Sequence, residues 1–212
     1  MITNKHKTGS FALKFCVLGD GGVGKTTLIE RIATGNFNPT TKMTIGINFS
    51  LIHLDLALDS GEAIDINLTV WDLGGEDRFR IILPSYMQGA DGGILMYDVN
   101  RYTSSMSLPN WYKMWKENVV PGTPIYLIGS KFDLIKPTMY SMVENNIKSL
   151  KEELGIKIHF LISTKDGLMI EDLMQTIVKD MWKFKNRVKP IQTPYSLERT
   201  LRMQKSSTDS QR

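Results

Sequence analysis

A glycine-rich segment, Gly-Asp-Gly-Gly-Val-Gly-Lys-Thr at residues 19–26, joins an apolar run at 13–18 to an amphipathic run at 25–34. Glycines let backbone N–H groups converge on phosphate oxygens, and the start of a helix adds a partial positive charge. The spacing matches the pattern GxxxxGK[ST], which occurs between a strand and a helix. We therefore expect Lys25 to reach the β- and γ-phosphates of a nucleoside triphosphate, and the Thr26 hydroxyl to bind Mg²⁺.

Strand-like and helix-like segments alternate along the rest of the chain. Short apolar runs typical of buried strands lie at 13–18, 92–97, 125–128 and 158–162, and helical periodicity lies at 25–34, 103–117, 141–154 and 168–185. Residues 48–58 and 63–71 alternate with a period of two around a turn signal at 59–62, which predicts an antiparallel hairpin. The order predicts a three-layer α/β fold of the P-loop NTPase kind, with ligands at the carboxyl ends of its parallel strands.

Composition fits one globular domain with extended ends. The chain has 212 residues, of which 42% are hydrophobic and 23% charged, so it can bury a full core. Cys16 is the only cysteine, which excludes a disulfide framework and a cysteine-ligated zinc site. No apolar run is long enough to span a membrane. We expect a flexible N-terminus at 1–10, a folded domain at 11–185 and a basic, disordered tail at 186–212.

The net charge of +4 comes from the C-terminal end of the chain. Residues 183–212 carry eight basic and two acidic side chains, so the first 182 residues carry a net charge of −2. The high isoelectric point therefore does not indicate a nucleic-acid-binding face, and we expect no nucleic-acid partner. The tail could attract an anionic membrane weakly, by about 1 kcal/mol per well-placed charge. A tail that merely solubilises the protein is the open alternative.

A second motif, Trp71-Asp72-Leu73-Gly74-Gly75, ends the second strand of the predicted hairpin. Asp72 can support Mg²⁺ through water there, and Gly75 can bring its N–H close to a γ-phosphate. Thr44 lies in a polar connection after the first helix, and its hydroxyl could complete the Mg²⁺ shell when a γ-phosphate is present. The pattern predicts a switch of two segments that order around γ-phosphate and metal and are released on hydrolysis.

Two loops that follow strands predict recognition of a base. In Ser130-Lys131-Phe132-Asp133, the Asp133 carboxylate can accept hydrogen bonds from the N1–H and the exocyclic amine of guanine, whereas adenine presents a bare acceptor at N1. The stem of Lys131 can lie along the base plane. Residues 163–165, Ser-Thr-Lys, can turn backbone N–H groups toward guanine O6. Each loop alone would also fit an ordinary surface turn.

Taken in order, the motifs GDGGVGKT, TIG, WDLGG, SKFD and STK resemble those of the Ras superfamily of small GTPases over residues 11–185. The segments WDLGGEDRFR and ILMYDVNR are most similar to the Rab branch, and WDLGG without a lipid site also resembles septation-initiation GTPases of the Spg/Tem kind. The resemblance implies a six-stranded, mostly parallel sheet with one antiparallel edge strand and about five helices. It also implies bound GTP or GDP with Mg²⁺, and hydrolysis of GTP to GDP and phosphate.

The resemblance assigns roles to single residues. Mg²⁺ would be held by Thr26 and Thr44 with support from Asp72, and Lys25, Thr44 and Glu76 would take part in hydrolysis. Phe37 matches the aromatic residue that packs edge-on against the base. The nucleotide-binding residues would be Gly21, Gly22, Val23, Gly24, Lys25, Thr26, Thr27, Phe37, Thr44, Gly75, Ser130, Lys131, Asp133, Ser163, Thr164 and Lys165.

The resemblance also implies partners and a cellular role. An exchange factor, a GTPase-activating protein and effectors would contact the switch segments at 36–46 and 72–84. The protein would act in intracellular trafficking or signalling, in the cytoplasm, and would be peripheral at membranes through its partners or its tail. A GTP-binding scaffold with little turnover is an open alternative. A P-loop ATPase or small-molecule kinase is another, although it predicts adenine preference and leaves Asp133 unexplained.

Three positions depart from the family pattern. Glu76 stands where the family has a glutamine that orients the attacking water; a carboxylate only accepts hydrogen bonds, so we expect slow intrinsic hydrolysis unless Glu76 is protonated. Ser130 stands where the family has an asparagine, and its hydroxyl can supply part of that network. The chain ends without a cysteine, so we expect no prenyl anchor. Arg101, after the run at 92–97, is a poor candidate for an arginine finger in cis.

Overall fold

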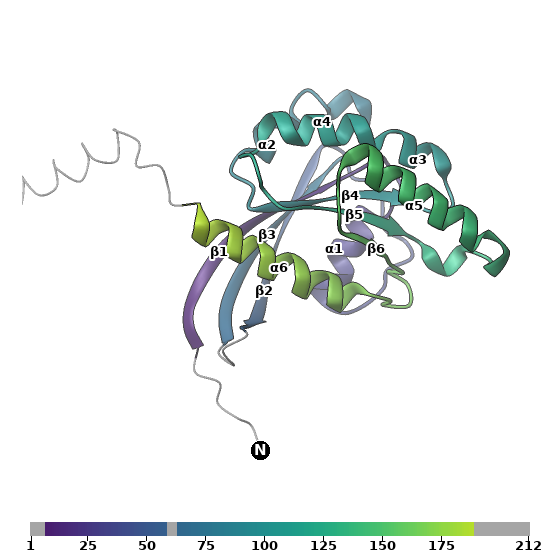
Figure 1. Cartoon of the computed structure of the whole chain (residues 1–212). Helices are drawn as coiled ribbons and strands as arrows, with labels where there is room; N and C mark the ends of the chain where they lie inside the picture. The colour runs from purple at the N-terminus through teal and green to yellow at the C-terminus, as the bar shows by residue number, and fades with distance from the viewer. Residues whose placement is uncertain (1–6, 59–62, 189–212) are drawn as a thin grey trace, which may run out of the picture.

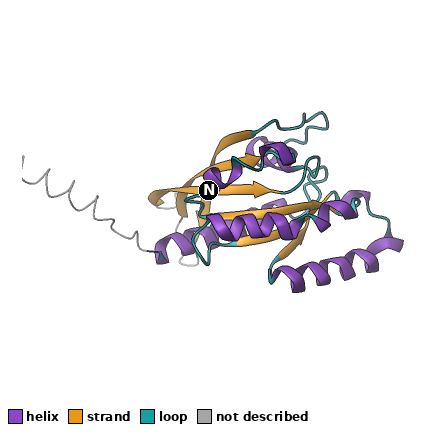
Figure 2. Cartoon of the chain, turned by 90° about the horizontal axis from the view of Figure 1, so that it is seen from above, coloured by secondary structure: helices purple, strands orange, loops and turns teal. Residues whose placement is uncertain are grey.

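The computed structural model of the chain describes residues 7–58 and 63–188 (Figure 1). The predicted turn at 59–62, the first six residues and the tail beyond residue 188 lie outside these described residues. The described part forms one sheet with helices on both of its faces (Figure 2). The predicted three-layer α/β fold is confirmed.

Six strands form a single sheet in the order β2-β3-β1-β4-β5-β6. Their bounds are β1 Lys7–Leu18, β2 Ile47–Ala57, β3 Ala63–Leu73, β4 Gly92–Asp98, β5 Ile125–Ser130 and β6 His159–Leu161. The edge strand β2 runs antiparallel to β3, from the pair Ile47↔Leu73 to the pair Ala57↔Ala63, and the other neighbours are parallel. The predicted hairpin and its antiparallel edge strand are therefore confirmed.

The helices cover the two faces of the sheet. Their bounds are α1 Lys25–Thr34, α2 Leu83–Met87, α3 Tyr102–Met106, α4 Leu108–Asn118, α5 Tyr140–Leu154 and α6 Ile170–Arg187. One predicted helix at 103–117 is divided into α3 and α4, because Pro109 in the first turn of α4 has no N–H to continue a helix through it. Among the described residues, no helix is long and apolar enough to cross a membrane.

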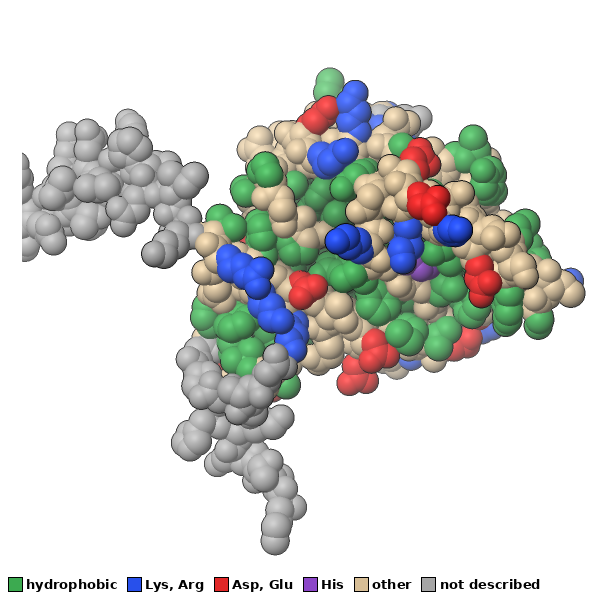
Figure 3. All heavy atoms as spheres, in the orientation of Figure 1, with side chains coloured by type: hydrophobic (Ala, Val, Ile, Leu, Met, Phe, Trp, Pro, Cys, Tyr) green, Lys and Arg blue, Asp and Glu red, His purple; other side chains and the backbone are tan. Residues whose placement is uncertain are grey.

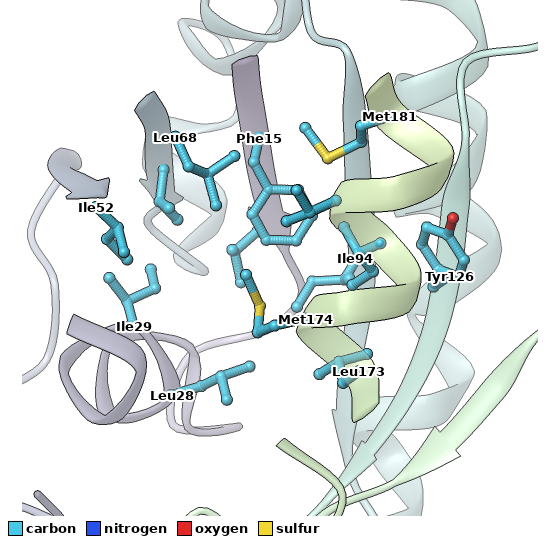
Figure 4. Close-up of a cluster of buried hydrophobic side chains, with 14 of the residues drawn as sticks. Phe15, Leu28, Ile29, Ile52, Leu68, Ile94, Tyr126, Leu173, Met174 and Met181 are labelled. Carbon is cyan, nitrogen blue, oxygen red and sulfur yellow. The ribbon is translucent and has the colours of Figure 1, made fainter. Parts of the chain in front are cut away.

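Alternate residues of β1 face opposite sides of the sheet, as the period of a strand requires. Phe15 packs in a cluster with residues of α1 and α6, including Leu28 and Leu173 (Figure 4). Its neighbour Cys16 packs on the other face with Trp111 and other residues of α2, α4 and α5. Each face of the sheet therefore has its own core. Trp111 and Trp115 of α4 are both only 1% exposed, so they belong to the core.

The first strand is longer than its apolar pattern indicates. β1 begins at Lys7, whereas the sequence predicted a strand at 13–18 and a flexible segment up to residue 10. Residues 7–10 join the ladder with β3, with Lys7 opposite Ala63 and Ser10 opposite Asp65. Backbone hydrogen bonds of a ladder do not depend on apolar side chains, which explains why the hydrophobic pattern missed this part of the strand.

The topology fixes where a ligand can bind. From β1 the chain first builds β2 and β3 on one side of the strand and then continues with β4, β5 and β6 on the other. The direction of the connections thus reverses at β1. In open α/β sheets, ligands bind outside the carboxyl ends of the strands at such a reversal. The glycine-rich segment at 19–26 directly follows the carboxyl end of β1, at this point.

Burial of His159 predicts a pH-dependent stability. His159 on β6 lies 3.2 Å from the Tyr97 hydroxyl through Nε2, and burial, reinforced by Lys151, lowers its pKa to about 4. Between pH 6.5 and 4 the unfolded chain therefore binds a proton that the folded chain does not, so the stability conferred by the neutral ring is lost as the pH falls. We expect this group to contribute at most about 3 kcal/mol across the window.

Urea unfolding at both ends of the window measures this contribution. His159→Gln should lose less stability on acidification than the wild type does. His53→Gln, at an exposed position of β2, is the matched control and should keep the wild-type pH dependence. The same acid-induced loss in the wild type and in His159→Gln would contradict the prediction.

Candidate functional site

A cavity of about 510 Å³ lies next to the carboxyl end of β1. This volume is within the range of small-molecule sites. Its walls contain most of the residues predicted from the sequence, namely Gly21, Gly22, Val23, Gly24, Lys25, Thr26, Thr27, Phe37, Thr44, Gly75, Ser130, Lys131, Asp133, Thr164 and Lys165. Three other predicted residues, Asp72, Glu76 and Ser163, do not line the cavity. Residues from five separate segments are thus brought together around one space.

The carbonyl groups of the segment at 19–24, called the phosphate loop below, are all held by hydrogen bonds. Lys25 Nζ donates to the carbonyl oxygens of Gly19 (2.8 Å) and Asp20 (2.9 Å). The Gly21 carbonyl accepts from Arg101 Nη2 (2.7 Å) and the Gly22 carbonyl from Lys131 Nζ (2.8 Å). The Val23 carbonyl accepts from Ser130 Oγ (2.7 Å) and the Gly24 carbonyl from the Leu28 N–H (2.9 Å).

The N–H groups of the phosphate loop are left for a ligand. In the described part of the chain, no backbone carbonyl accepts a hydrogen bond from residues 21–24. Gly24 has a φ of 96°, which lets the loop turn directly into α1. A buried N–H without a partner is costly, so a row of them facing a cavity indicates an anion site.

Lys25 brings a positive charge to the same place. It is only 5% exposed, and its pKa is lowered to about 8, first by desolvation and also by the charge of Arg101, against the opposing effects of Asp72 and Asp20. Transfer of a cation out of water is unfavourable unless an anion compensates. The burial of Lys25 therefore fits an anionic ligand such as a phosphate chain.

Three oxygen atoms converge beside the phosphate loop. Thr26 Oγ1 and Thr44 Oγ1 lie 2.6 Å apart, and both donate to Asp72 Oδ2, at 2.5 and 3.0 Å. Asp72 is 2% exposed, and its second carboxylate oxygen, Oδ1, is buried and has no hydrogen-bond partner among residues 7–58 and 63–188. Hydroxyl and carboxylate oxygens are ligands for Mg²⁺. The unpaired carboxylate oxygen and the two converging hydroxyls fit such a cation.

The opposite end of the cavity is built from the loops after β5 and β6. Ser163 Oγ donates to Asp133 Oδ1 at 2.8 Å, so Ser163 orients the carboxylate although it does not itself line the cavity. Lys131, whose φ is 59°, extends to the carbonyl of Gly22 and also pairs with Asp98 at 2.8 Å. Ser130 is buried between the carbonyls of Val23 (2.7 Å) and Tyr97 (2.8 Å), so it joins the phosphate loop to β4.

Glu76 lies away from the cavity. Its Oε2 atom pairs with Nε of Arg78 at 2.6 Å, and the residue follows Gly75, which does line the cavity. The backbone of Gly75 packs against the phosphate loop so closely that a Cβ atom there would lie 2.1 Å from the backbone nitrogen of Gly21. Only glycine fits at this contact.

Sequence reasoning missed a group of residues behind the phosphate loop. The indole Nε1 of Trp111 donates to Asp20 Oδ1 at 2.8 Å, and the guanidinium of Arg80 lies 4.8 Å from the centre of the Trp111 ring. The contact between Trp111 and Asp20 joins residues 91 positions apart in the sequence. The local pattern of the sequence carries no signal for it.

A second missed feature is an exposed row of aromatic side chains. Phe49 on β2, Trp71 on β3 and Tyr86 on α2 follow one another with ring centres 5.8 and 5.4 Å apart. Phe49 is 66% exposed. Phe49 and Trp71 lie between the two predicted switch segments in the sequence, and Tyr86 follows the second one. The signal that the sequence offered was the pair of apolar residues Phe49 and Leu51 on the exposed face of an edge strand. On the face of the molecule that Figure 3 shows, acidic and basic side chains are interspersed with apolar ones.

A phosphate loop after the central strand of such a sheet defines a nucleoside-triphosphate-binding α/β protein. The model of the Ras family matches residues 14–183 of the chain, which therefore belongs to the Ras family of small GTPases, enzymes that bind and hydrolyse GTP. Within it the chain is Rab-like. It is 34% identical over 200 residues to Ras-related protein Rab-8B of Dictyostelium discoideum, covering 94% of this chain and 92% of the relative. It is 35% identical over 186 residues to Rab-13 of Bos taurus, covering 85% and 88%.

Proposed function

We propose that this chain is a Mg²⁺-dependent guanine-nucleotide switch that acts in intracellular trafficking or signalling and is timed by its own hydrolysis of GTP. One observation carries the proposal: a single cavity is lined both by the phosphate loop and by Asp133. One end offers N–H groups and a buried cation to phosphates, and the other offers a carboxylate to a purine edge. Guanine has two donors for that carboxylate, whereas adenine has an acceptor at N1.

Thr26, Thr44 and Asp72 would hold the metal ion. Held there, Mg²⁺ would supply positive charge that offsets the negative charge of the phosphates during phosphoryl transfer. Lys25 would stabilise the same charge from the phosphate loop. Two of the three N–H bonds of its ammonium group are directed to the Gly19 and Asp20 carbonyls, which leaves the third for a phosphate oxygen.

The two switch segments would respond together to the nucleotide. The Gly74 N–H donates to the Gly46 carbonyl at 2.8 Å, which joins segment 72–84 to segment 36–46. Thr44 in one segment contacts the proposed metal site, and Gly75 in the other contacts the phosphate loop. Both contacts lie where the γ-phosphate and the metal ion would bind, so loss of the γ-phosphate would weaken both. Because a hydrogen bond joins the two segments, they would be released together.

Exchange factors, activating proteins and effectors would bind this region. Met43 and Ile45 in the first switch segment and Ile81 in the second are 64%, 73% and 87% exposed. Together with the row of Phe49, Trp71 and Tyr86, they would supply apolar contacts whose arrangement changes with the state of the switch. Exposed apolar clusters of this kind mark protein interaction sites.

The GTPase domain takes up most of the chain, and its chemistry fits a cytoplasmic protein. We assign the GTPase domain to residues 11–185, extended by the observed start of β1 at Lys7 and end of α6 at Arg187. A cytoplasmic location agrees with Cys16 being a buried free thiol. The basic tail at 186–212 would add only weak electrostatic attraction to an anionic membrane.

Replacing Glu76 with glutamine is expected to speed hydrolysis. A glutamine can donate and accept hydrogen bonds, and the substitution removes the ion pair with Arg78 that holds the side chain away from the cavity, so the side chain at position 76 becomes free to turn toward the attacking water. We expect a single-turnover rate about tenfold higher than that of the wild type. Glu117→Gln, which removes an exposed carboxylate paired with Lys113 on α4, is the matched control and should leave the rate unchanged. Equal rates for wild type and Glu76→Gln would remove Glu76 from the mechanism.

The position of Glu76 also favours a second candidate function, a GTP-bound scaffold with very slow turnover. The wild-type rate, measured with and without cell extract as a source of activating protein, separates the two: extract accelerates a timed switch and leaves a scaffold unchanged. An arginine supplied by such a partner can add a factor of about 10³–10⁵. Chromatographic identification of the nucleotide that co-purifies tests both. GDP or GTP supports the proposal, and an adenine nucleotide contradicts it.

A further inference from the structure

Arg101 lies against the outside of the phosphate loop. Its Nη2 atom donates to the Gly21 carbonyl at 2.7 Å, and its Nη1 atom is 3.7 Å from the point where a Cβ of Gly22 would lie. The sequence placed this arginine only in a loop after a strand, and its distance from the glycines, 80 residues, hid the contact.

The backbone around Arg101 is fixed. Its N–H donates to the Asp98 carbonyl at 3.0 Å, at the end of β4. Its own carbonyl accepts from the Ser104 N–H at 2.9 Å and from the Ser104 hydroxyl at 2.6 Å. Ser104 is 1% exposed, so these bonds anchor the arginine to the core. The side chain is exposed, but it extends from a rigid base.

The contact determines the direction of one N–H group in the loop. A trans peptide is planar, so the carbonyl of Gly21 and the N–H of Gly22 point in opposite directions. The carbonyl points to Arg101, which does not line the cavity, whereas Gly21 and Gly22 both do. A carbonyl held from outside therefore turns the Gly22 N–H toward the cavity. A cation bound to a carbonyl also polarises the peptide and strengthens its N–H as a donor.

The neighbouring peptide is held in the same way, with one difference. Lys131 donates to the Gly22 carbonyl at 2.8 Å, but it shares its charge with Asp98, whose Oδ2 atom is also 2.8 Å away. Among the described residues, the structure gives Arg101 no carboxylate partner. The guanidinium of Arg101 therefore differs from the ammonium of Lys131, whose charge is partly neutralised by its ion pair with Asp98.

We propose that Arg101 is a positioning residue for GTP hydrolysis: its guanidinium fixes the Gly21–Gly22 peptide and strengthens the Gly22 N–H as a donor to the phosphate chain. The inference rests on the proposed function. Negative charge on the phosphate oxygens redistributes during phosphoryl transfer, so a stronger, pre-oriented donor stabilises the transition state more than the bound nucleotide. Arg101 thus affects the rate of hydrolysis more than the affinity.

The test compares Arg101→Ala, Arg101→Lys and the control Arg187→Ala, which removes an exposed arginine at the end of α6. For each, single-turnover hydrolysis of GTP, the affinity for GDP and the phosphorus NMR resonances of bound nucleotide are measured with Mg²⁺ present. We expect Arg101→Ala to hydrolyse about tenfold more slowly, as loss of one charge-assisted hydrogen bond predicts, with little change in GDP affinity. Its phosphorus resonances should shift, and Arg101→Lys should recover most of the rate.

A wild-type rate and unshifted resonances in Arg101→Ala would overturn the inference. So would equal losses of rate in Arg101→Ala and Arg101→Lys, since a lysine keeps the charge and a donor. If the wild type binds guanine nucleotide without hydrolysing it, the proposal that hydrolysis times the switch is overturned. The shift of the phosphorus resonances in Arg101→Ala then decides by itself whether Arg101 positions the phosphate loop. A wild type that binds no guanine nucleotide would overturn the proposed function and this inference together.

Discussion

Replacing Asp133 with asparagine is expected to lower the affinity for GDP and GTP by about 10²–10⁴, because two charge-assisted hydrogen bonds to guanine are lost. The amide would present a donor toward the donors of the base. Xanthine has a carbonyl where guanine has its exocyclic amine, so xanthosine nucleotides should bind Asp133→Asn better than they bind the wild type. Fluorescence titration of the wild type and of Asp133→Asn with guanosine and with xanthosine nucleotides measures this change in base preference.

The fold should tolerate this substitution. Ser163 donates to Asp133 Oδ1, and an asparagine oxygen can accept the same hydrogen bond. Asp166→Asn is the matched control, since Asp166 lies in the loop after β6 and is exposed. It should keep the wild-type preference for guanosine nucleotides. Retained guanine affinity in Asp133→Asn would show that the carboxylate does not read the base.

Replacing Lys25 with methionine is expected to lower the affinity for GTP by about 10²–10³, the value of one to two charge-assisted hydrogen bonds to phosphate. The apo protein should remain folded with little change in stability. Loss of the hydrogen bonds to the Gly19 and Asp20 carbonyls is destabilising, and removal of the charge of a lysine that is only 5% exposed is stabilising, so the two effects oppose one another.

Calorimetric titration with GTP and thermal unfolding of the apo protein separate binding from folding. Lys113→Met, at an exposed position of α4, is the matched control and should bind GTP as the wild type does. An unchanged GTP affinity in Lys25→Met would mean that the phosphate chain does not reach the buried lysine, and the assignment of the phosphate loop would be wrong.

The parts of the site that the sequence predicted are those with a local pattern. The glycine spacing at 19–26 and the strand before it located the phosphate loop, and the two-residue period of β2 and β3 located the hairpin. The contacts that the sequence could not predict join distant positions. Arg101 reaches Gly21 across 80 residues, and Trp111 reaches Asp20 across 91.

Packing also changed single predictions. Pro109 divided one predicted helix into two, and a ladder with β3 extended β1 beyond its apolar residues. The sequence predicts that Glu76 takes part in hydrolysis; in the structure its carboxylate pairs with Arg78 and does not line the cavity, and its role in hydrolysis stays a prediction. A local motif identifies which residue stands at a position, whereas the direction of a long side chain depends on which partner lies within reach.

The most direct test of the central claim is isothermal titration of the nucleotide-free protein with GDP and with ADP, in the presence of Mg²⁺. The cavity that joins the phosphate loop to Asp133 predicts saturable binding of GDP at one site per chain, with ADP bound far more weakly. Absence of heat with GDP, or equal affinities for GDP and ADP, would contradict the account.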